Sequence, residues 1–443
     1  MKKTLLLIAS IMVMHSSGLK AQTATQTAME IAADMYPGWN LGNTLEAGPC
    51  PWFDNELDCE TAWQDTKTTQ EIIDYVKSLG FRSVRIPCSW YIHMDQNYTI
   101  SSKWMDRVQE VVDYCIKDSL YVILNDHYDN GWIERSFSTQ TPSSINKNNT
   151  ILSMMWRQIA NRFRDYDHHL LFAGMNEPEV GGDNSHDEEG EAAALAKYQQ
   201  TFVNTVRQTG GNNNTRILVV QAPLTNIGLA AKYNIIPTDI TPSALMLEVH
   251  FYSPFEFCQL EEDKEWGYRA FYWGEGNYVD GSKYNSTWGG EDLIQKEMRQ
   301  MKNKYSSKGY PVVLGEFGSL WRNIIPEGEN QDVHNASIRL WYKTVCKYAI
   351  RNGIIPFVWD TNFRGYPSGT IVDRKNLCIY NQFAYDGMME GCQSERWPHF
   401  TTDITAPAIL STDDMMYDLN GRQLTSEPTK GLYIRNGKKV GVK

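Results

Sequence analysis

The sequence predicts a (β/α)8 barrel, the TIM-barrel architecture, followed by a small β appendage over residues 401–443. Eight strand-like runs alternate with segments of helical periodicity. Most of these runs are continuously apolar, as expected for parallel strands that are covered on both faces. A doubly wound open sheet is the alternative, but no glycine-rich phosphate-binding turn follows the first run.

The predicted strands share an apolar body and end in polar or turn-forming residues. They cover residues 36–43, 81–87, 121–127, 170–177, 216–222, 245–252, 311–318 and 354–360. The fourth run, LLFAGMNE, ends in Asn176 and Glu177, and Pro178 follows directly. Because proline cannot donate a hydrogen bond to a strand ladder, Pro178 turns the chain into a loop.

The predicted helices lie between these strands and carry an apolar stripe at helical spacing. They cover residues 68–80, 101–120, 191–211, 291–309 and 337–353. The first has the spacing of a capping box, with Thr68 followed by Glu71, and Gly80 suits its C-terminal end.

Both ends of the chain differ from the barrel region, which we expect to be one domain over residues 22–400. Residues 1–21 combine two early lysines with a short apolar core and predict a signal peptide, and hence a secreted, periplasmic or cell-surface protein. In residues 401–443, a linker precedes two Asn-Gly hairpin signals, at 420–421 and 436–437. This segment resembles the C-terminal tails that direct cargo of the type IX secretion system in Bacteroidetes; a plain edge hairpin or flexible tail is the alternative.

Composition excludes several classes of partner. The formal net charge is −11, and removal of the three lysines of residues 1–21 makes it −14. Such an acidic protein has no general affinity for nucleic acid or anionic lipid. Beyond the N-terminal segment, no run is apolar for long enough to span a bilayer. The eight cysteines form no CxxC pair; Cys50 and Cys59 could close a disulfide loop or remain buried thiols.

Polar and ionisable residues gather where the predicted strands end. In a barrel of this kind, the C-terminal strand ends form the active-site rim. Glu177 ends the fourth strand and Glu316 lies in the seventh, so their side chains face each other across the mouth. Two carboxyl groups across a cleft are what hydrolysis of a glycosidic bond requires: one protonates the leaving oxygen and the other attacks the anomeric carbon.

The ordered set of motifs resembles glycoside hydrolase family 5. The motifs are GWNLGNTLEA, VRIP, NDH, MNEP, HFYSPFEF, GEFG and PFVWD, and they span roughly residues 36–360. The resemblance implies that Glu177 is the acid/base and Glu316 the nucleophile of a retaining mechanism. It also implies that Asn176 binds the sugar 2-hydroxyl, and that Arg85 lies beside the nucleophile.

The resemblance implies further substrate contacts. Tyr252 would bond the nucleophile, Trp359 would form the sugar platform, and His127 and His250 would contact substrate or tune the acid pair. The end of the first strand adds the candidates Asn40 and Trp39, and the loops after the third and sixth strands add Trp132 and Trp273. Asp126, before His127, departs from many family members and puts the contact there in doubt. No metal or cofactor is predicted.

Each assignment has an alternative. Arg85 could be a buried salt-bridge residue, His127 and His250 could be satisfied core histidines, and each tryptophan could belong to the core. The acid-rich segment 181–191 could bind calcium, but it lacks the ordered spacing of a calcium loop, which favours a rim loop.

The resemblance implies an endo-β-1,4-glucanase, with plant cellulose, mixed-linkage glucan or xyloglucan as substrate, and we expect a monomer. An endo-β-1,4-mannanase with the same acid pair is one alternative. A non-catalytic glycan-binding barrel is another, since fold does not determine function. A zinc-dependent barrel hydrolase would need histidines that the first and fifth strands lack.

Overall fold

The computed structural model describes residues 26–400, except 140, 182–186 and 234, together with the backbone of four short strands between residues 416 and 442. The predicted signal peptide (1–21) and the start of the predicted linker (401–415) lie outside the described residues.

Eight parallel strands close into a barrel, as the sequence predicts. They are β1 (Gly38–Asn40), β2 (Ser83–Ile86), β3 (Tyr121–Asn125), β4 (Leu170–Ala173), β5 (Leu218–Gln221), β6 (Leu245–Phe251), β7 (Val312–Phe317) and β8 (Ile354–Val358). Each strand pairs with the next in the sequence, and β8 pairs with β1. The strands are shorter than the predicted runs, because the last residues of each run leave the ladder and enter the rim loops.

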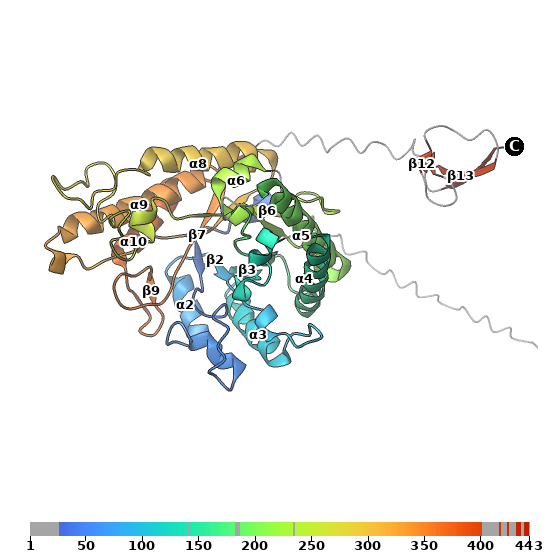
Figure 1. The fold of residues 1–443 in the computed structure, drawn as a ribbon, viewed down its shortest axis with the longest axis horizontal. Helices are drawn as coiled ribbons and strands as arrows, with labels where there is room; N and C mark the ends of the chain where they lie inside the picture. The colour runs from blue at the N-terminus through green and yellow to red at the C-terminus, as the bar shows by residue number, and fades with distance from the viewer. Residues whose placement is uncertain are drawn as a thin grey trace, which may run out of the picture.

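Helices surround the barrel (Figure 1). The larger ones are α2 (Gln70–Ser78), α3 (Ser102–Lys117), α4 (Pro142–Arg162), α5 (Glu188–Gln208), α8 (Glu291–Lys304), α9 (Gln331–Arg351) and α10 (Gln382–Gln393). Three shorter helices are α1 (Ala28–Ala32), α6 (Ile227–Lys232) and α7 (Phe255–Cys258). The five predicted helical segments are therefore confirmed, while α4, α10 and the three shorter helices lie in segments for which no helix is predicted.

Strand alternation divides the apolar core in two. Outward-facing residues such as Leu247 and Val249 of β6 join the helices in the larger cluster. Inward-facing residues such as Met246 of β6 and Val313 of β7 form a second cluster inside the barrel. Helix α1 packs on that inner cluster through Ile31, at the end of the barrel where the strands begin.

The capping box predicted at Thr68 does not form, and helix α2 begins one residue later than that box requires. The N-cap of α2 is Thr69, and its side chain makes no capping hydrogen bond. The backbone N–H of Thr68 instead donates to the buried carboxylate of Glu60, 2.7 Å away. A tertiary hydrogen bond therefore satisfies this backbone N–H group and takes the place of a local helix cap.

The C-terminal appendage is a four-stranded sheet in the order β12–β11–β13–β14. Strands β13 (Gly431–Arg435) and β14 (Lys438–Val442) are antiparallel, and Arg435 pairs with Lys438. β11 (Met416–Tyr417) pairs antiparallel with β12 (Gln423–Leu424). The two hairpins predicted around the Asn-Gly pairs are thus confirmed. Loop strands β9 (Val372–Asp373) and β10 (Cys378–Ile379) form a separate two-stranded sheet.

Two further features bear on sequence expectations. Cys50 and Cys59 are buried free thiols, so the structure holds no disulfide between them. Within the described part of the chain, no helix is both long and apolar enough to cross a membrane.

Candidate active site

The two glutamates singled out from the sequence meet at the mouth of the barrel. Glu316 lies in β7, and Glu177 follows β4 by four residues. Oxygen atoms of the two carboxyl groups and a nitrogen of His250 all lie within 4.8 Å of one another. Glu316 is buried, whereas the Glu177 side chain is 44% exposed. The pair is therefore close, and Glu177 is the member that a bound molecule can reach more easily.

Arg85 of β2 organises the floor of this site. Its side chain is fully buried. Nη1 donates to Glu316 Oε1 at 3.1 Å and to Asn40 Oδ1 at 3.0 Å, and Nη2 donates to Asn176 Oδ1 at 2.9 Å. Arg85 is thus both a buried salt-bridge residue and the neighbour of Glu316. Its fixed charge favours the ionised form of that carboxyl group.

Two further donors surround the acid pair. The Tyr252 hydroxyl donates to Glu316 Oε2 at 3.0 Å. Burial, together with the charges of Glu316 and Glu177, raises the pKa of Tyr252 far above its usual value, so the hydroxyl keeps its proton. Because Asn176 accepts from Arg85 through Oδ1, its Nδ2 is the group that can donate to a bound molecule.

His250 of β6 links the two carboxyl groups. Its Nδ1 lies 2.6 Å from Glu177 Oε1 and 3.7 Å from Glu316 Oε2. Burial lowers the pKa of His250, but the charge of Glu316 and the hydrogen bonds to Glu177 and Glu248 outweigh it and raise this pKa to about 10. His250 is therefore an imidazolium at neutral pH, and it donates a proton towards Glu177.

The environment separates the pKa values of the two acids. Burial raises the pKa of Glu316, and the charges of Glu177 and Glu248 act in the same direction, against His250 and Arg85. Burial also raises the pKa of Glu177, but the hydrogen bond and the charge of His250 more than offset it, and the net direction is downward. The proton in the hydrogen bond between the two groups therefore resides on His250.

Aromatic side chains flank the acid pair. The His127 ring stacks on partly exposed Trp359, with centroids 5.6 Å apart. Burial, together with the charges of Arg85 and His250, lowers the pKa of His127, so it is neutral. Partly exposed Trp132 stacks on Tyr91 at 5.2 Å and donates through Nε1 to Asp126, 3.1 Å away. Asp126 thus holds Trp132 in the rim.

Three predicted substrate contacts are wrong in this structure, because the side chains are fully buried. Trp39 donates through Nε1 to Asp360 at 2.9 Å and packs under Arg374. Trp273 donates through Nε1 to the Gly289 carbonyl. Asn40 donates to the Gly315 carbonyl at 2.8 Å while it accepts from Arg85. The tryptophans hold loops in place, and Asn40 orients the arginine.

Sequence reasoning missed three residues of the site. Glu248 of β6 is fully buried beneath His250. Gln221 at the end of β5 donates to Glu248 at 2.8 Å. The Thr225 hydroxyl lies 3.4 Å from Glu177. Only Glu248 left a signal in the sequence: a charged residue at an inward position of an otherwise apolar strand.

A groove leads away from Glu177 along the rim. Its first hollow, of about 210 Å³, reaches from Glu177 past Ser253 to Glu297 of α8. A second hollow, of about 560 Å³, shares Ser253 and Glu297 and continues to Tyr278 and Trp288. The side chains of Tyr278 and Trp288 are each about half exposed. The Trp288 Nε1 donates to Glu256 at 2.8 Å, which fixes its ring.

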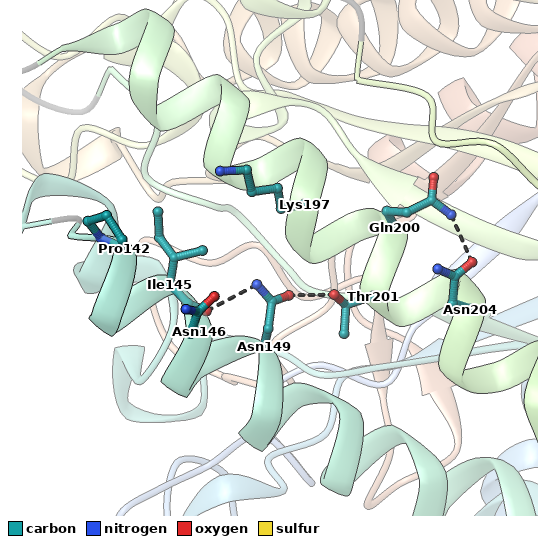
Figure 2. A pocket seen from close by; sticks show the side chains of 8 residues that line it. All are labelled: Pro142, Ile145, Asn146, Asn149, Lys197, Gln200, Thr201 and Asn204. Atoms are coloured by element: carbon teal, nitrogen blue, oxygen red, sulfur yellow. Dashed lines mark hydrogen bonds between the residues drawn. The ribbon is translucent and has the colours of Figure 1, made fainter. Parts of the chain in front are cut away.

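Another groove lies between α4 and α5, away from the acid pair (Figure 2). It is lined by Pro142, Ile145, Asn146, Asn149, Lys197, Gln200, Thr201 and Asn204. Its amides bond to neighbours: Thr201 donates to Asn149 at 2.5 Å, and Gln200 donates to Asn204 at 2.9 Å. The groove has a volume of about 410 Å³ but contains none of the predicted site residues.

Two groups of side chains in the described residues are close enough to bind a metal ion. One is Glu177, His250 and Glu316, and the other is the turn Asp167, His168 and His169. In the first group, the guanidinium of Arg85 and the imidazolium of His250 already supply positive charge. Of the acid-rich segment 181–191, residues 182–186 lie outside the described residues, so calcium binding by this segment stays an untested alternative.

Comparison with known proteins agrees with this geometry. Residues 46–365 match the family model described as Cellulase (glycosyl hydrolase family 5). Endoglucanase A of Paenibacillus barcinonensis is 35% identical over 390 residues, which cover 84% of this chain and 92% of that protein. The xyloglucan-specific endo-β-1,4-glucanase of Bacteroides ovatus is 34% identical, over 82% of this chain and 70% of that protein.

Solved structures extend the likeness to three dimensions. A family 5 xyloglucan-specific β-1,4-glucanase from a ruminal metagenomic library, in complex with XXLG, is 45% identical with a TM-score of 0.77. The aligned region covers 84% of this chain and 98% of that one. Together with the barrel and the paired carboxyl groups at its mouth, these matches show that the chain belongs to glycosyl hydrolase family 5 and is a glycoside hydrolase of the endo-β-1,4-glucanase type.

Proposed function

We propose that the chain is a retaining endo-β-1,4-glucanase that cleaves xyloglucan in preference to unbranched glucans. The observation that carries the retaining mechanism is the distance between the acids, whose oxygens lie within 4.8 Å. Retaining enzymes hold their carboxyl groups about 5–5.5 Å apart, whereas inverting enzymes need about 6.5–9.5 Å to admit a water molecule.

The proposed roles follow from the surroundings of each acid. Glu316 is buried against two donors, Arg85 and Tyr252, and is the nucleophile. Glu177 is more exposed and lies beside the groove, so it is the acid/base. Its proton comes through the 2.6 Å hydrogen bond from His250.

The reaction proceeds in two displacements. In the first, an oxygen of Glu316 bonds to the anomeric carbon, the glycosidic bond breaks, and the leaving oxygen takes a proton from Glu177. In the second, Glu177 takes a proton from water as the water oxygen attacks the anomeric carbon, and the bond to Glu316 breaks. Asn176 donates to the sugar 2-hydroxyl, while Trp359 and His127 support the ring.

Two findings favour xyloglucan. Relatives described as xyloglucan-specific include the Bacteroides ovatus protein and the ruminal structure at 45% identity. The groove beside Glu177 widens towards Trp288 and Tyr278, which gives room for a branch on the leaving-group side. A half-exposed tryptophan and tyrosine suit the apolar faces of sugar rings.

The test is product release from tamarind xyloglucan, barley β-glucan, carboxymethyl cellulose and galactomannan, with wild type and Glu316→Ala side by side. We expect the highest kcat/KM on xyloglucan and no release by the variant. Preference for an unbranched glucan would overturn the substrate assignment. Cleavage of galactomannan alone would favour the mannanase alternative, and binding without cleavage would favour a glycan-binding barrel.

We infer that the protein is a monomer. We further infer that residues 1–21 direct export and that residues 401–443 act as a sorting signal of the Bacteroidetes type. The support is the sequence pattern of both segments. Fractionation of a Bacteroidetes host that expresses the full chain or a chain ending at residue 400 tests this. Equal surface delivery of both would contradict the sorting role, and a dimer in size-exclusion chromatography would contradict the monomer.

A further inference from the structure

Glu248 is a buried carboxylate for which the two displacements above assign no role. It lies on the inward face of β6, two residues before His250, and its side chain is fully buried. The inward positions one layer nearer the start of the strands are apolar, such as Met246 of the same strand and Val219 of β5. A carboxylate in such surroundings is costly unless charged or hydrogen-bonded partners compensate it.

Three side chains compensate Glu248. Its Oε1 lies 2.9 Å from Arg85 Nε and 3.3 Å from His250 Nε2, and its Oε2 accepts from Gln221 Nε2 at 2.8 Å. Gln221 is fixed in turn, because its Oε1 accepts from the backbone N–H of Met175, next to Asn176. Glu248 thus connects the arginine below Glu316 with the histidine beside Glu177.

The facing strand leaves space for this carboxylate. Gly315 of β7 precedes Glu316, and a Cβ atom at that position would lie 1.9 Å from Glu248 Oε1. No side chain larger than glycine fits there while Glu248 keeps its place. The position of the Glu248 carboxylate therefore depends on the presence of glycine at position 315, the first residue of the GEFG motif.

We propose that Glu248 is a positioning residue that keeps His250 protonated, so that His250 can supply the proton of Glu177. In this arrangement, the Nδ1 proton of His250 moves to Glu177 and then to the leaving oxygen. The Nε2 proton stays in the hydrogen bond to Glu248. During the second displacement, the proton from water returns through Glu177 to Nδ1. The proposal rests on the acid/base role of Glu177 given above.

Glu248 is the constant charge among the groups that face His250. These groups are Glu177 after β4, Glu316 of β7, Glu248 and Tyr252 from β6 and its end, Arg85 of β2 and His127 after β3. During the reaction, Glu177 gains and loses a proton and Glu316 becomes an ester. Their negative charges disappear in turn, while that of Glu248 remains. Arg85 opposes protonation of His250, so a permanent carboxylate is needed to balance it.

The first test compares the pH dependence of kcat/KM in wild type, Glu248→Gln and Glu248→Asp. The glutamine variant removes the charge but keeps the shape, so we expect the alkaline limb to move down by about one pH unit or more, the effect of one close opposite charge. At neutral pH, we expect kcat to fall about tenfold or more. The aspartate variant keeps the charge and should restore most of the alkaline limb.

Glu60→Gln is the matched control. Glu60 is also a buried glutamate paired with an arginine, Arg107, at 2.7 Å, but it lies outside the active site. The Glu60→Gln variant should have a lower free energy of unfolding than wild type, but the same pH dependence of kcat/KM. If Glu248→Gln lowers kcat/KM by the same factor at every pH and leaves both limbs of the pH profile in place, the role of Glu248 is purely structural and the proposal is overturned.

A second test requires neither enzymatic activity nor a Glu248 variant that folds. NMR of 15N-histidine reports the protonation of His250 in Glu177→Gln/Glu316→Gln, where Glu248 is the remaining carboxylate in contact. We expect His250 to stay protonated above its usual pKa of 6.5. Titration below 6.5, as burial alone would give, would contradict the proposal. If His250 titrates high but the polysaccharide panel shows no cleavage, the proposed function fails and the positioning role of Glu248 stands.

Discussion

At the scale of single residues, each chemical property of the site arises from a few close contacts. Arg85 lies between two carboxylates, Glu248 at 2.9 Å and Glu316 at 3.1 Å. Buried ion pairs add little net stability, but removal of one partner typically costs about 3–5 kcal/mol because the other is left uncompensated. Substitutions in this cluster should therefore be compared with variants that keep the shape of the side chain.

Substitution of the proposed acid/base gives the first residue-scale prediction. Glu177→Gln should lower kcat on xyloglucan by about 10²–10⁴-fold, the usual contribution of general acid–base catalysis. On an activated aryl glycoside, the loss should be much smaller, because that leaving group departs without a proton. Initial rates on both substrates measure this difference.

Glu179→Gln is its control, since Glu179 lies on the same loop and is exposed. It should cleave both substrates at close to wild-type rates. Equal losses on the two substrates in Glu177→Gln would assign the acid role to another residue.

The raised pKa of His250 gives a second prediction, for stability against pH. The folded-state value of about 10 exceeds the usual 6.5, so protonated His250 contributes stability that is fully present below pH 6.5. This contribution is lost as the pH rises from 6.5 to about 10. The free energy of unfolding in urea, measured across that range, should fall more steeply in wild type than in His250→Gln.

Identical slopes in the two proteins would show that His250 does not hold its proton in the folded state. Tyrosine and cysteine residues also titrate in this range, but they are common to both proteins and cancel in the comparison.

At the scale of elements, the barrel strands carry two patterns at once. Their outward and inward apolar residues build the two cores, and their last residues supply the site. A strand-end rule therefore predicts Glu177, Glu316 and Arg85 from the sequence, and the structure places these residues close together. It fails for Trp39, Trp273 and Asn40, because residue type does not show whether a side chain faces the mouth or the core.

The groove and the contacts of Glu248 lay beyond sequence reasoning for a related reason. Glu248 and Gly315 come from neighbouring strands, 67 positions apart in the printed sequence, and only the register of β6 and β7 places them together. Likewise, Thr225 reaches Glu177 through a short turn after β5 that has no distinctive sequence. Long-range register of this kind is fixed by packing, not by local pattern.

The two glycines of GEFG give an element-scale prediction. Gly315→Ala places a Cβ 1.9 Å from the Glu248 carboxylate, so it should displace that side chain and lower the free energy of unfolding by about 1–3 kcal/mol, as overpacking does. Activity should fall with it. Gly318→Ala meets its nearest neighbour, the Tyr342 hydroxyl, at an ordinary 3.6 Å and should be close to neutral.

Urea unfolding and rates on xyloglucan test both variants together. If Gly315→Ala were as stable and active as Gly318→Ala, the close fit between β6 and β7 would be without consequence.

At the scale of the whole molecule, the family match and the predicted site residues all fall in residues 36–365. The C-terminal sheet forms its own hydrogen-bonded unit in residues 416–442. The barrel closes on itself without it, through the pairing of β8 with β1.

Removal of the tail is the prediction at this scale. A chain of residues 22–400 should keep the Tm and the kcat/KM of residues 22–443, because the barrel core and the acid pair lie entirely within it. Thermal unfolding and xyloglucan kinetics on both chains measure this. A drop of many degrees, or a large loss of kcat/KM, would mean that the tail supports the catalytic domain.

In the proposed mechanism, Glu316 forms a covalent bond to the sugar while Glu177 supplies the proton. This mechanism is tested most directly by trapping the intermediate with an activated 2-deoxy-2-fluoro β-cello-oligosaccharide and locating the label by peptide mass spectrometry. We expect one sugar per chain, attached to Glu316 in the peptide that contains the GEFG motif, and no label in Glu316→Gln. A label on Glu177, or turnover without any covalent adduct, would contradict it.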